Sequence, residues 1–379
     1  MFISSLKFIF YASGMWRSTS LKKNWKHFLY NIYIIFSLIN YFLFTILIFI
    51  YLLNQIKNVD KFTESLFYFT TAFANFIKII SFTLKNKTIL EMQSMFSNKI
   101  CQSRDNYESQ ILDNVSKTCR ANTIIFQAAF YSAGMMLFLT SFDKNGNISL
   151  ILNTWTPNDI NNSKLIFFIF YFYQTFGLFM TLMILLSSEC FAMIIVLQIG
   201  GQLDIFVHRL NLLSAEKNEN SSQCLNYRLE SKIIGNCVKH HNYIFAIGDK
   251  LNDLFGLIIF VQFFASMVGL CGVIFQLSRI SNGSWLFLVF LGSLTLQTFI
   301  YNLYGETLIK KSLAISNEIW KINWFNLRNT TKKDLNMIAI RASRPIEITG
   351  SSIIVMSFST FVKVIKSAYS IFNLLNSFS

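Results

Sequence analysis

The chain has 379 residues, of which 53% are hydrophobic and 16% aromatic, while only 14% are charged and two are proline. Soluble domains usually carry about 25% charged residues, and here the charges are crowded between long uncharged runs, as expected where a bilayer leaves polar groups without partners. This composition excludes a chain built from ordinary soluble domains, and the net charge of +14 does not indicate a nucleic-acid partner, because the basic residues flank the uncharged runs.

Seven runs with few or no charges are long enough for a membrane-spanning helix of roughly 20 residues. In chain order they are residues 30–53, 65–84, 121–141, 165–200, 254–277, 285–304 and 348–374. The sequence therefore predicts an all-α membrane protein with seven transmembrane helices. Because the fourth run is about twice as long as a span requires at 1.5 Å per residue, we expect its second half to continue as a helix beyond the membrane.

The distribution of lysine and arginine predicts the orientation of these helices. One set of alternate connections holds 25 of these basic residues and the other set holds 5. Cytoplasmic segments are enriched in lysine and arginine, so the N-terminus is predicted to be cytoplasmic and the C-terminus extracellular.

The first 29 residues are predicted to form a cytoplasmic arm. Residues 1–15 are apolar and end in small residues, as a signal peptide does, but Lys7 interrupts the apolar stretch and no basic segment precedes it. We therefore favour an interfacial helix in contact with membrane lipid over a signal peptide.

The chain carries no motif that predicts an enzyme or a cofactor. Cys237, His240 and His241 are close enough in sequence to bind zinc from one helix, but no second pair of ligands lies nearby. The glycine pairs lack the lysine and hydroxyl residues of a phosphate-binding loop. We expect no metal site, no cofactor and no nucleic acid.

The outer halves of the second, third, fourth and sixth spans combine aromatic and small residues with isolated hydroxyls and amides, which is typical of a small-molecule pocket. On one helix face each, the second, third and fourth spans carry Tyr68, Thr71, Ala72 and Asn75; Tyr131, Gly134, Met135 and Phe138; and Phe167, Tyr171, Gln174 and Leu178. Any packed interface shows the same spacing, so ordinary packing stays open as an alternative. Because these faces carry no charge, the ligand is expected to be neutral.

Two segments resemble the insect odorant receptors. From Tyr171 the chain reads YFYQTFGLFMTLMILLSSECFAMIIVLQIGGQLDIFVHRL, and from Cys237 it reads CVKHHNYIFAIGDKLNDLFGLIIFVQFFASMVGLC. Further matches begin at Tyr304 and at Thr349. Glu189 stands where the family more often has aspartate. The last helix lacks the Gln-Phe ending of the related gustatory receptors, since Leu375 and Asn376 occupy that place.

The resemblance implies a ligand-gated, nonselective cation channel in the plasma membrane of olfactory sensory neurons, working as a heterotetramer with the family's co-receptor and binding a small volatile odorant. It implies that residues 30–304 hold the first six spans, 305–345 a cytosolic region with an assembly helix, and 346–379 a pore-lining seventh span. Phe372, Leu375 and Asn376 then align with the family's pore gate. Lys363 and Lys366, in the same run, would face a water-filled vestibule or extend to the membrane surface.

Three other functions remain as alternatives. A gustatory-type receptor channel would share the fold. A G-protein-coupled receptor would begin outside the cell, opposite to the charge count, and would usually have proline kinks in its spans. A secondary transporter would show inverted repeats and interrupted helices, which the sequence lacks.

Overall fold

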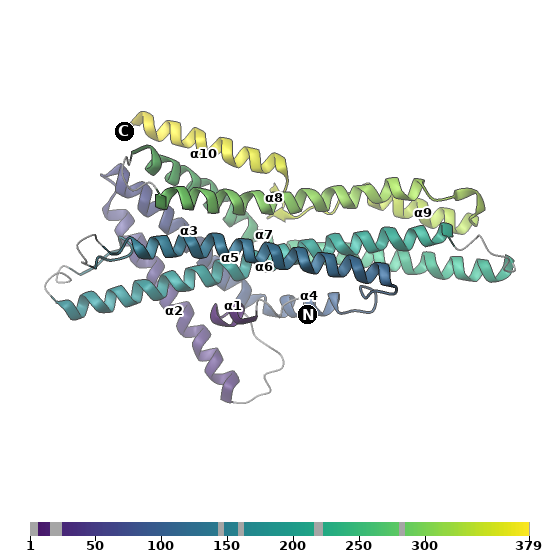
Figure 1. Cartoon of the computed structure of the whole chain (residues 1–379), viewed down its shortest axis with the longest axis horizontal. Helices are drawn as coiled ribbons and strands as arrows, with labels where there is room; N and C mark the ends of the chain where they lie inside the picture. Colours follow the sequence, from purple (N-terminus) through teal and green to yellow (C-terminus); the bar gives the residue numbers. More distant parts are fainter. Residues whose placement is uncertain are drawn as a thin grey trace.

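The computed structural model describes residues 7–15, 25–142, 148–157, 163–215, 223–279 and 285–378. The helices are α1 Lys7–Ala12, α2 Trp25–Asn54, α3 Val59–Leu84, α4 Asn86–Phe96, α5 Asn106–Leu139, α6 Lys164–Ala215, α7 Gln223–Arg279, α8 Trp285–Trp320, α9 Asn329–Ala342 and α10 Phe358–Phe378, with a 3-10 turn, η2, at Trp324–Asn326. They form an elongated bundle in which α5, α6, α7 and α8 run side by side (Figure 1).

The all-α fold and the first six predicted spans are confirmed. Among the described residues, six helices are long and apolar enough to cross a membrane, namely α2, α3, α5, α6, α7 and α8. The fourth predicted span also continues as a helix, since α6 runs without interruption to Ala215. The helices α5 and α7 are likewise longer than a bilayer requires, and their extra turns carry the charged residues that separate the apolar runs.

The predicted seventh span, residues 348–374, was wrong at its beginning. Its first part is a hairpin in which strand β1, Thr349–Gly350, pairs antiparallel with β2, Ile354–Val355. Ser351 and Ser352 form the turn with positive φ angles of 51° and 60°. Apolarity suggested a helix here, but β-branched residues around a Gly-Ser turn favour a hairpin. The helix α10 begins only at Phe358 and is not one of the six apolar helices.

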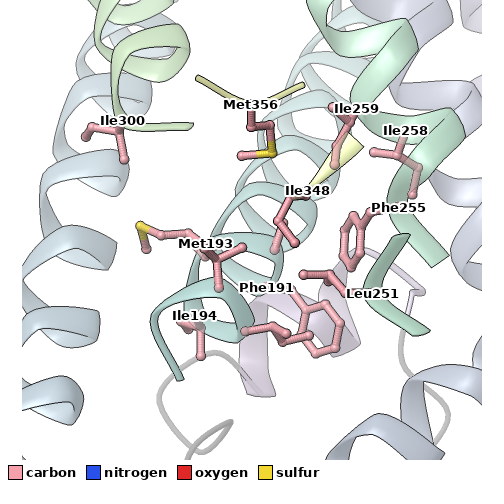
Figure 2. Packing of buried hydrophobic residues seen from close by; sticks show 14 of the residues in the cluster. Phe191, Met193, Ile194, Leu251, Phe255, Ile258, Ile259, Ile300, Ile348 and Met356 are labelled. Carbon is pink, nitrogen blue, oxygen red and sulfur yellow. The ribbon is translucent and has the colours of Figure 1, made fainter. Parts of the chain in front are cut away.

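The hairpin packs against the bundle with its turn exposed, and the residues that flank it complete the core. Ile348 and Met356 are buried and point toward Phe255 of α7 and Phe191 of α6 (Figure 2). The backbone of Met356 approaches α8 at Gly305, where a side chain would collide with it. The hairpin therefore depends on this glycine, and it places the start of α10 against α7 and α8.

The first helix is also placed differently from the prediction. Phe10 of α1 is fully buried, and its ring packs edge-on against that of Phe191 in α6 at 5.6 Å and against Phe82 of α3 at 6.5 Å. The predicted interfacial helix is thus a short helix packed into the bundle. An apolar segment gains more from aromatic packing in the core than from a position on a lipid surface, where one side stays wet.

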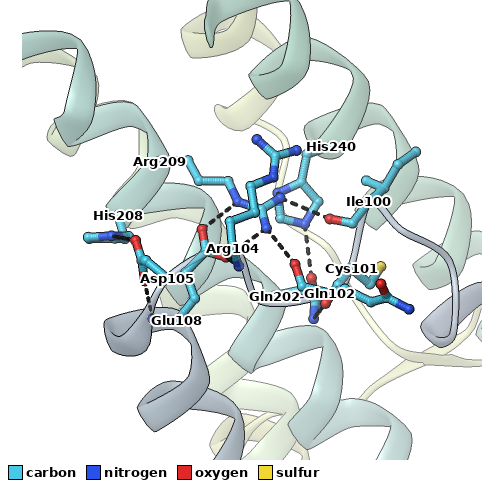
Figure 3. A network of polar contacts seen from close by, with 10 residues as sticks. All are labelled: Ile100, Cys101, Gln102, Arg104, Asp105, Glu108, Gln202, His208, Arg209 and His240. Carbon is cyan, nitrogen blue, oxygen red and sulfur yellow. Dashed lines mark hydrogen bonds and ion pairs between the residues drawn. The ribbon is translucent and has the colours of Figure 1, made fainter.

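The helical extensions are joined by a polar network around Arg209 of α6 (Figure 3). Its guanidinium donates to both carboxylate oxygens of Glu108 at 2.6 and 2.9 Å and to the carbonyl oxygens of Ile100 and Gln102 at 2.9 Å each. His240 of α7 lies 3.2 Å from the same guanidinium. The network fixes the α4–α5 connection, the start of α5, α6 and α7 in one arrangement.

Candidate functional site

A strongly apolar cavity lies between α2, α3, α5, α6 and α8, and its volume is about 100 Å³. Its lining is almost wholly aliphatic or aromatic and carries no charge. The residues are Phe44, Ile48, Phe67, Tyr68, Thr71, Ala72, Phe130, Ala133, Gly134, Leu137, Leu152, Leu178, Thr181, Leu182, Leu185, Phe290, Ser293 and Leu294. A cavity with these walls suits a compact neutral molecule.

Most hydroxyl groups in the cavity wall already donate their proton to their own helix. Thr71 donates to the carbonyl of Phe67 at 2.9 Å, and Thr181 donates to that of Gly177 at 2.8 Å. The Ser293 hydroxyl lies 2.9 Å from the Val289 carbonyl of its own helix and 3.2 Å from the Ala129 carbonyl of α5, so its proton is also used within the protein. These groups can therefore only accept a further hydrogen bond. No hydrogen bond of the Tyr68 hydroxyl occurs within the described part of the chain, so this group remains available to donate to a ligand.

Five of the twelve residues predicted for the pocket line this cavity. They are Tyr68, Thr71, Ala72, Gly134 and Leu178. On α5 the true lining face is rotated by one residue from the predicted one, so that Tyr131 and Met135 have exposed fractions of 39% and 60% and face away from the bundle. Both faces have the same apolar spacing, and only the packing of α6 against α5 selects between them.

The remaining predicted residues surround the outer end of the cavity. Gln174 is buried and holds the α5–α6 connection, accepting from the backbone nitrogen of Leu152 at 3.1 Å and donating to its carbonyl and to the Thr154 hydroxyl at 2.9 Å each. Because Leu152 lines the cavity, Gln174 shapes the cavity without touching it.

Phe138 and Phe167 pack around the ring of Tyr171 at 6.4 and 6.3 Å. The hydroxyl of Tyr171 lies 3.3 Å from that of Ser141. Asn75 lies one turn after the wall residue Thr71 on α3 and donates to the carbonyl of Thr181. These four predicted residues are brought near the cavity but do not line it.

The sequence analysis missed the contributions of two helices and one loop. Phe44 and Ile48 come from α2, Phe290, Ser293 and Leu294 from α8, and Leu152 from the α5–α6 connection. The sixth span was expected to contribute, but no residue was assigned there. The first span is apolar on every side, so no periodicity marks the face that meets the cavity.

The proposed gate residues lie near the end of α10. Phe372 and Leu375 are half-buried and pack against the core, whereas Asn376 is exposed. A second face of α10 is exposed and polar along its whole length. It consists of Lys363, Lys366, Ser370, Asn373 and Ser377, spaced alternately by three and four residues. One helix can therefore present a polar stripe and hold its apolar side against α7 and α8.

The Cys-His group considered for zinc is buried in the polar network. The Nδ1 of His240 accepts from Arg209 at 3.2 Å, and its Nε2 donates to the amide oxygen of Gln202 at 2.9 Å. A different trio, Asp105, Glu108 and His208, brings ligand atoms within 4.8 Å of one another. Its geometry is explained without a metal, because Glu108 pairs with Arg209 and Asp105 pairs with His208 at 2.8 Å.

Comparisons with known proteins agree with this architecture. A sequence profile described as 7tm Odorant receptor matches residues 58–369. Odorant receptor 9a of Drosophila melanogaster is 34% identical over 135 residues, which are 35% of this chain and 34% of that receptor. Odorant receptor 67c of the same fly is 23% identical over 62% of this chain and 56% of its own length. The matched region is thus about a third to just over half of these two relatives.

A solved structure has the same fold over the whole chain. It is that of the insect olfactory receptor OR5 from Machilis hrabei in complex with eugenol, with a TM-score of 0.82 and coverage of 100% of this chain and 98% of that one. The sequence identity is 14%, so this likeness bears on the fold alone.

Proposed function

The chain belongs to the insect family of 7tm odorant receptors, and from this membership we propose that it is the ligand-tuning subunit of an odorant-gated, nonselective cation channel. The observation that carries the proposal is the apolar, uncharged cavity between α2, α3, α5, α6 and α8. Members of this family are receptors and channels, and the chain is therefore a receptor and not an enzyme.

The proposed ligand is a small neutral volatile molecule with at most one or two polar atoms. Burying its apolar surface contributes roughly 25 cal/mol per Å², and a hydrogen bond adds about 1 kcal/mol. Tyr68 is the group best placed to donate that bond, since Thr71 and Ser293 bind their own backbone. Alcohols, esters, ketones and terpenoids fit this description, as does the eugenol bound by the Machilis receptor.

The proposed partner is the family's shared co-receptor in a heterotetramer, and α9 with the preceding turn supports it. Four large apolar side chains at the end of α8, in the turn η2 and on α9 are exposed in the single chain. They are Trp320 at 61%, Phe325 at 95%, Met337 at 69% and Ile340 at 64%. Apolar groups of this size gathered on charged helical segments are typical of a protein interface. Residues 305–345 are accordingly proposed as the cytosolic assembly region.

The helix α10 is proposed to line the pore. Phe372 and Leu375 would form an apolar closure that excludes water, with Asn376 beside the ion path. The polar stripe of α10 supports a wet surface on this helix, and Lys363 and Lys366 on it are exposed rather than packed. A charged side chain inside a bilayer needs water or a counter-charge, which a vestibule would supply.

The proposed orientation has a cytoplasmic N-terminus and an extracellular C-terminus, in the plasma membrane of sensory neurons. The C-terminus lies at the same end of the bundle as the α2–α3, α5–α6 and α7–α8 connections, and α9 lies toward the other end (Figure 1). A tag before Met1 should be stained only after permeabilisation, whereas a tag after Ser379 should be stained on intact cells. The reverse pattern would refute the orientation.

Recording current from cells that express the chain with and without the co-receptor, across an odorant panel, tests the function. Leu178→Phe reduces the cavity and should change which odorants are effective, while Met135→Phe, on the exposed face of α5, should not. Surface labelling of both variants controls for expression. Absence of odorant-evoked current in the wild type, or equal effects of the two variants, would contradict the proposal.

A further inference from the structure

A buried ion pair lies among the helices that form the ligand cavity. The ammonium of Lys78 on α3 is 2.6 Å from a carboxylate oxygen of Glu189 on α6 and 2.6 Å from the amide oxygen of Gln262 on α7. The exposed fractions of the two charged side chains are 1% and 0%. Charges inside a membrane bundle are costly and are kept where they have a specific role.

A second, much smaller cavity adjoins this pair. Its volume is about 10 Å³, and its wall is formed by Ile259, Gln262, Phe263, Ser266, Gln297, Thr298 and Tyr301. The amide of Gln297 on α8 is buried, and neither its nitrogen nor its oxygen has a hydrogen-bond partner among the described residues. Gln262 donates to the hydroxyl of Ser266 at 3.1 Å and so connects the cavity wall with the ion pair.

We propose that this small cavity holds one water molecule, which bonds the Gln297 amide to the Lys78–Gln262–Ser266 group. The volume is the room that a single water needs, and the wall offers an amide donor, an amide acceptor and hydroxyl oxygens. An amide without partners in a bilayer is strongly unfavourable, whereas a water with two to four partners removes that penalty. The water thereby joins α8 to α3, α6 and α7.

The position of this network suggests what it does. On α8, Ser293 and Leu294 line the ligand cavity, and Gln297 follows one turn later. Further along α8, the amide oxygen of Asn302 accepts from the backbone nitrogen of Ser357 at 3.0 Å, and Glu306 accepts from that of Phe358 at 3.3 Å. In chain order, α8 therefore contacts the ligand cavity, the proposed water site and the start of α10.

The water-bridged network is accordingly the element that sets the balance between the closed and open channel, an assignment that rests on the proposed function of the cavity and of α10. A buried polar group has a few discrete hydrogen-bonding arrangements, unlike an apolar contact, which deforms gradually. A ligand that displaces α8 changes which arrangement is favoured, and the populations of the two states shift. Because the network does not touch the ligand, it acts equally on every odorant.

Gln297→Leu tests this assignment, since leucine has a similar size and cannot hold the water. Expressed with the co-receptor, the variant should shift the half-maximal concentrations of all odorants by the same factor, several-fold or more, and should change the unliganded current. The rank order of odorants should stay as in the wild type. Thr307→Val is the control, because this hydroxyl on α8 donates only to Leu303 of its own helix.

Three results would overturn the assignment. The first is a Gln297→Leu variant that reaches the surface normally and keeps the half-maximal odorant concentrations and the unliganded current of the wild type. The second is a shift of the half-maximal concentration for only some odorants. The third is a shift in Thr307→Val that equals the shift in Gln297→Leu. If Gln297→Leu does not reach the surface, Ser266→Ala removes the link to Gln262 and is judged by the same measurements. If the wild type gives no odorant-evoked current, the proposed function fails. The water site is then tested separately by a cryo-electron microscopy map that shows waters. Density between Gln297 and Ser266 supports the water, and its absence contradicts it.

Discussion

The region around Arg209 and the wall of the cavity differ in the interactions that join their helices. In the half that holds the helical extensions, Arg209 makes hydrogen bonds to Glu108 and to two backbone carbonyls, and these bonds join α6 to α5 and to the α4–α5 connection. Around the cavity, the hydroxyl of Thr71 bonds within its own helix, and that of Ser293 bonds within α8 and also reaches the Ala129 carbonyl of α5. The cavity wall itself is almost wholly apolar, and the Lys78–Glu189 ion pair lies outside it.

The packing around Arg209 is therefore determined by the direction of hydrogen bonds, whereas the packing around the cavity is determined mainly by the volume of apolar side chains. A charged side chain in a buried ion pair tolerates almost no substitution, because its partner would be left buried and unpaired. Apolar contacts tolerate changes that conserve volume. A chain built in this way can change the wall of its cavity while the polar frame around Arg209 stays the same.

The largest effect is expected in the inner half, from Arg209→Leu. The change leaves the Glu108 carboxylate, which has an exposed fraction of 1%, buried without its partner, at a cost of about 3–5 kcal/mol. Surface biotinylation and thermal unfolding in detergent should show loss of folded protein. Lys117→Ala breaks the exposed pair with Asp113 and should cost at most about 1 kcal/mol. Equal losses would remove the distinction between the halves.

A smaller effect is expected from Gly134→Ala in the cavity. The added methyl group would lie 2.6 Å from a terminal carbon of Leu182, which must move into the cavity. Overpacking of this kind costs about 1–3 kcal/mol, so odorant potency should fall by about tenfold while the surface level is kept. Gly292→Ala on α8 meets no atom within 4 Å and serves as the control. Unchanged potency for every odorant would place ligand binding elsewhere.

A partial effect is expected from Phe372→Ala at the end of α10. Widening an apolar constriction admits water, so unliganded current should rise by a few-fold. The rise should be incomplete because the co-receptor would supply the other members of the ring. Substitution of Asn376 should change the reversal potential more than the odorant preference. If neither current nor reversal potential changes at normal surface level, this end of α10 does not line the gate.

The smallest effect is expected from Asp105, the residue that caps α5 in the inner half. Its carboxylate accepts from the backbone nitrogen of Glu108 at 2.7 Å, and this bond, together with His208, holds the pKa of the carboxyl below its usual range. The capping contribution is therefore constant above the unfolded pKa of about 3.9 and is lost only as the pH falls through the folded value.

Asp105→Ala should lower the free energy of unfolding by about 1 kcal/mol, and Asp105→Asn by less, because the amide oxygen still accepts the bond. Thermal unfolding between pH 5 and 8 measures both variants against the wild type. A difference between wild type and Asp105→Ala that varies across this range would show that the carboxylate acts through a titrating partner instead of through the cap.

The sequence by itself determined the membrane class, the first six helices and the continuation of the fourth. These follow from the length of uncharged runs, since a bilayer demands about 20 apolar residues whatever the neighbouring helices are. The resemblance to odorant receptors was also visible in the segments from Tyr171 and Cys237, because it consists of the residues themselves and does not depend on how the helices pack. On α3, where polar and apolar faces differ, periodicity alone found Tyr68, Thr71 and Ala72.

Only the tertiary structure decided which face of α5 lines the cavity, and that Gln174 holds the α5–α6 connection. On a helix that is apolar on several sides, periodicity does not distinguish lipid from a neighbouring helix, because both are equally apolar. The hairpin at residues 349–355 was hidden for a related reason. No charge marks these residues as different from a span, and the hairpin forms where Gly350 packs against the α7 backbone and Gly305 of α8 admits the backbone of Met356.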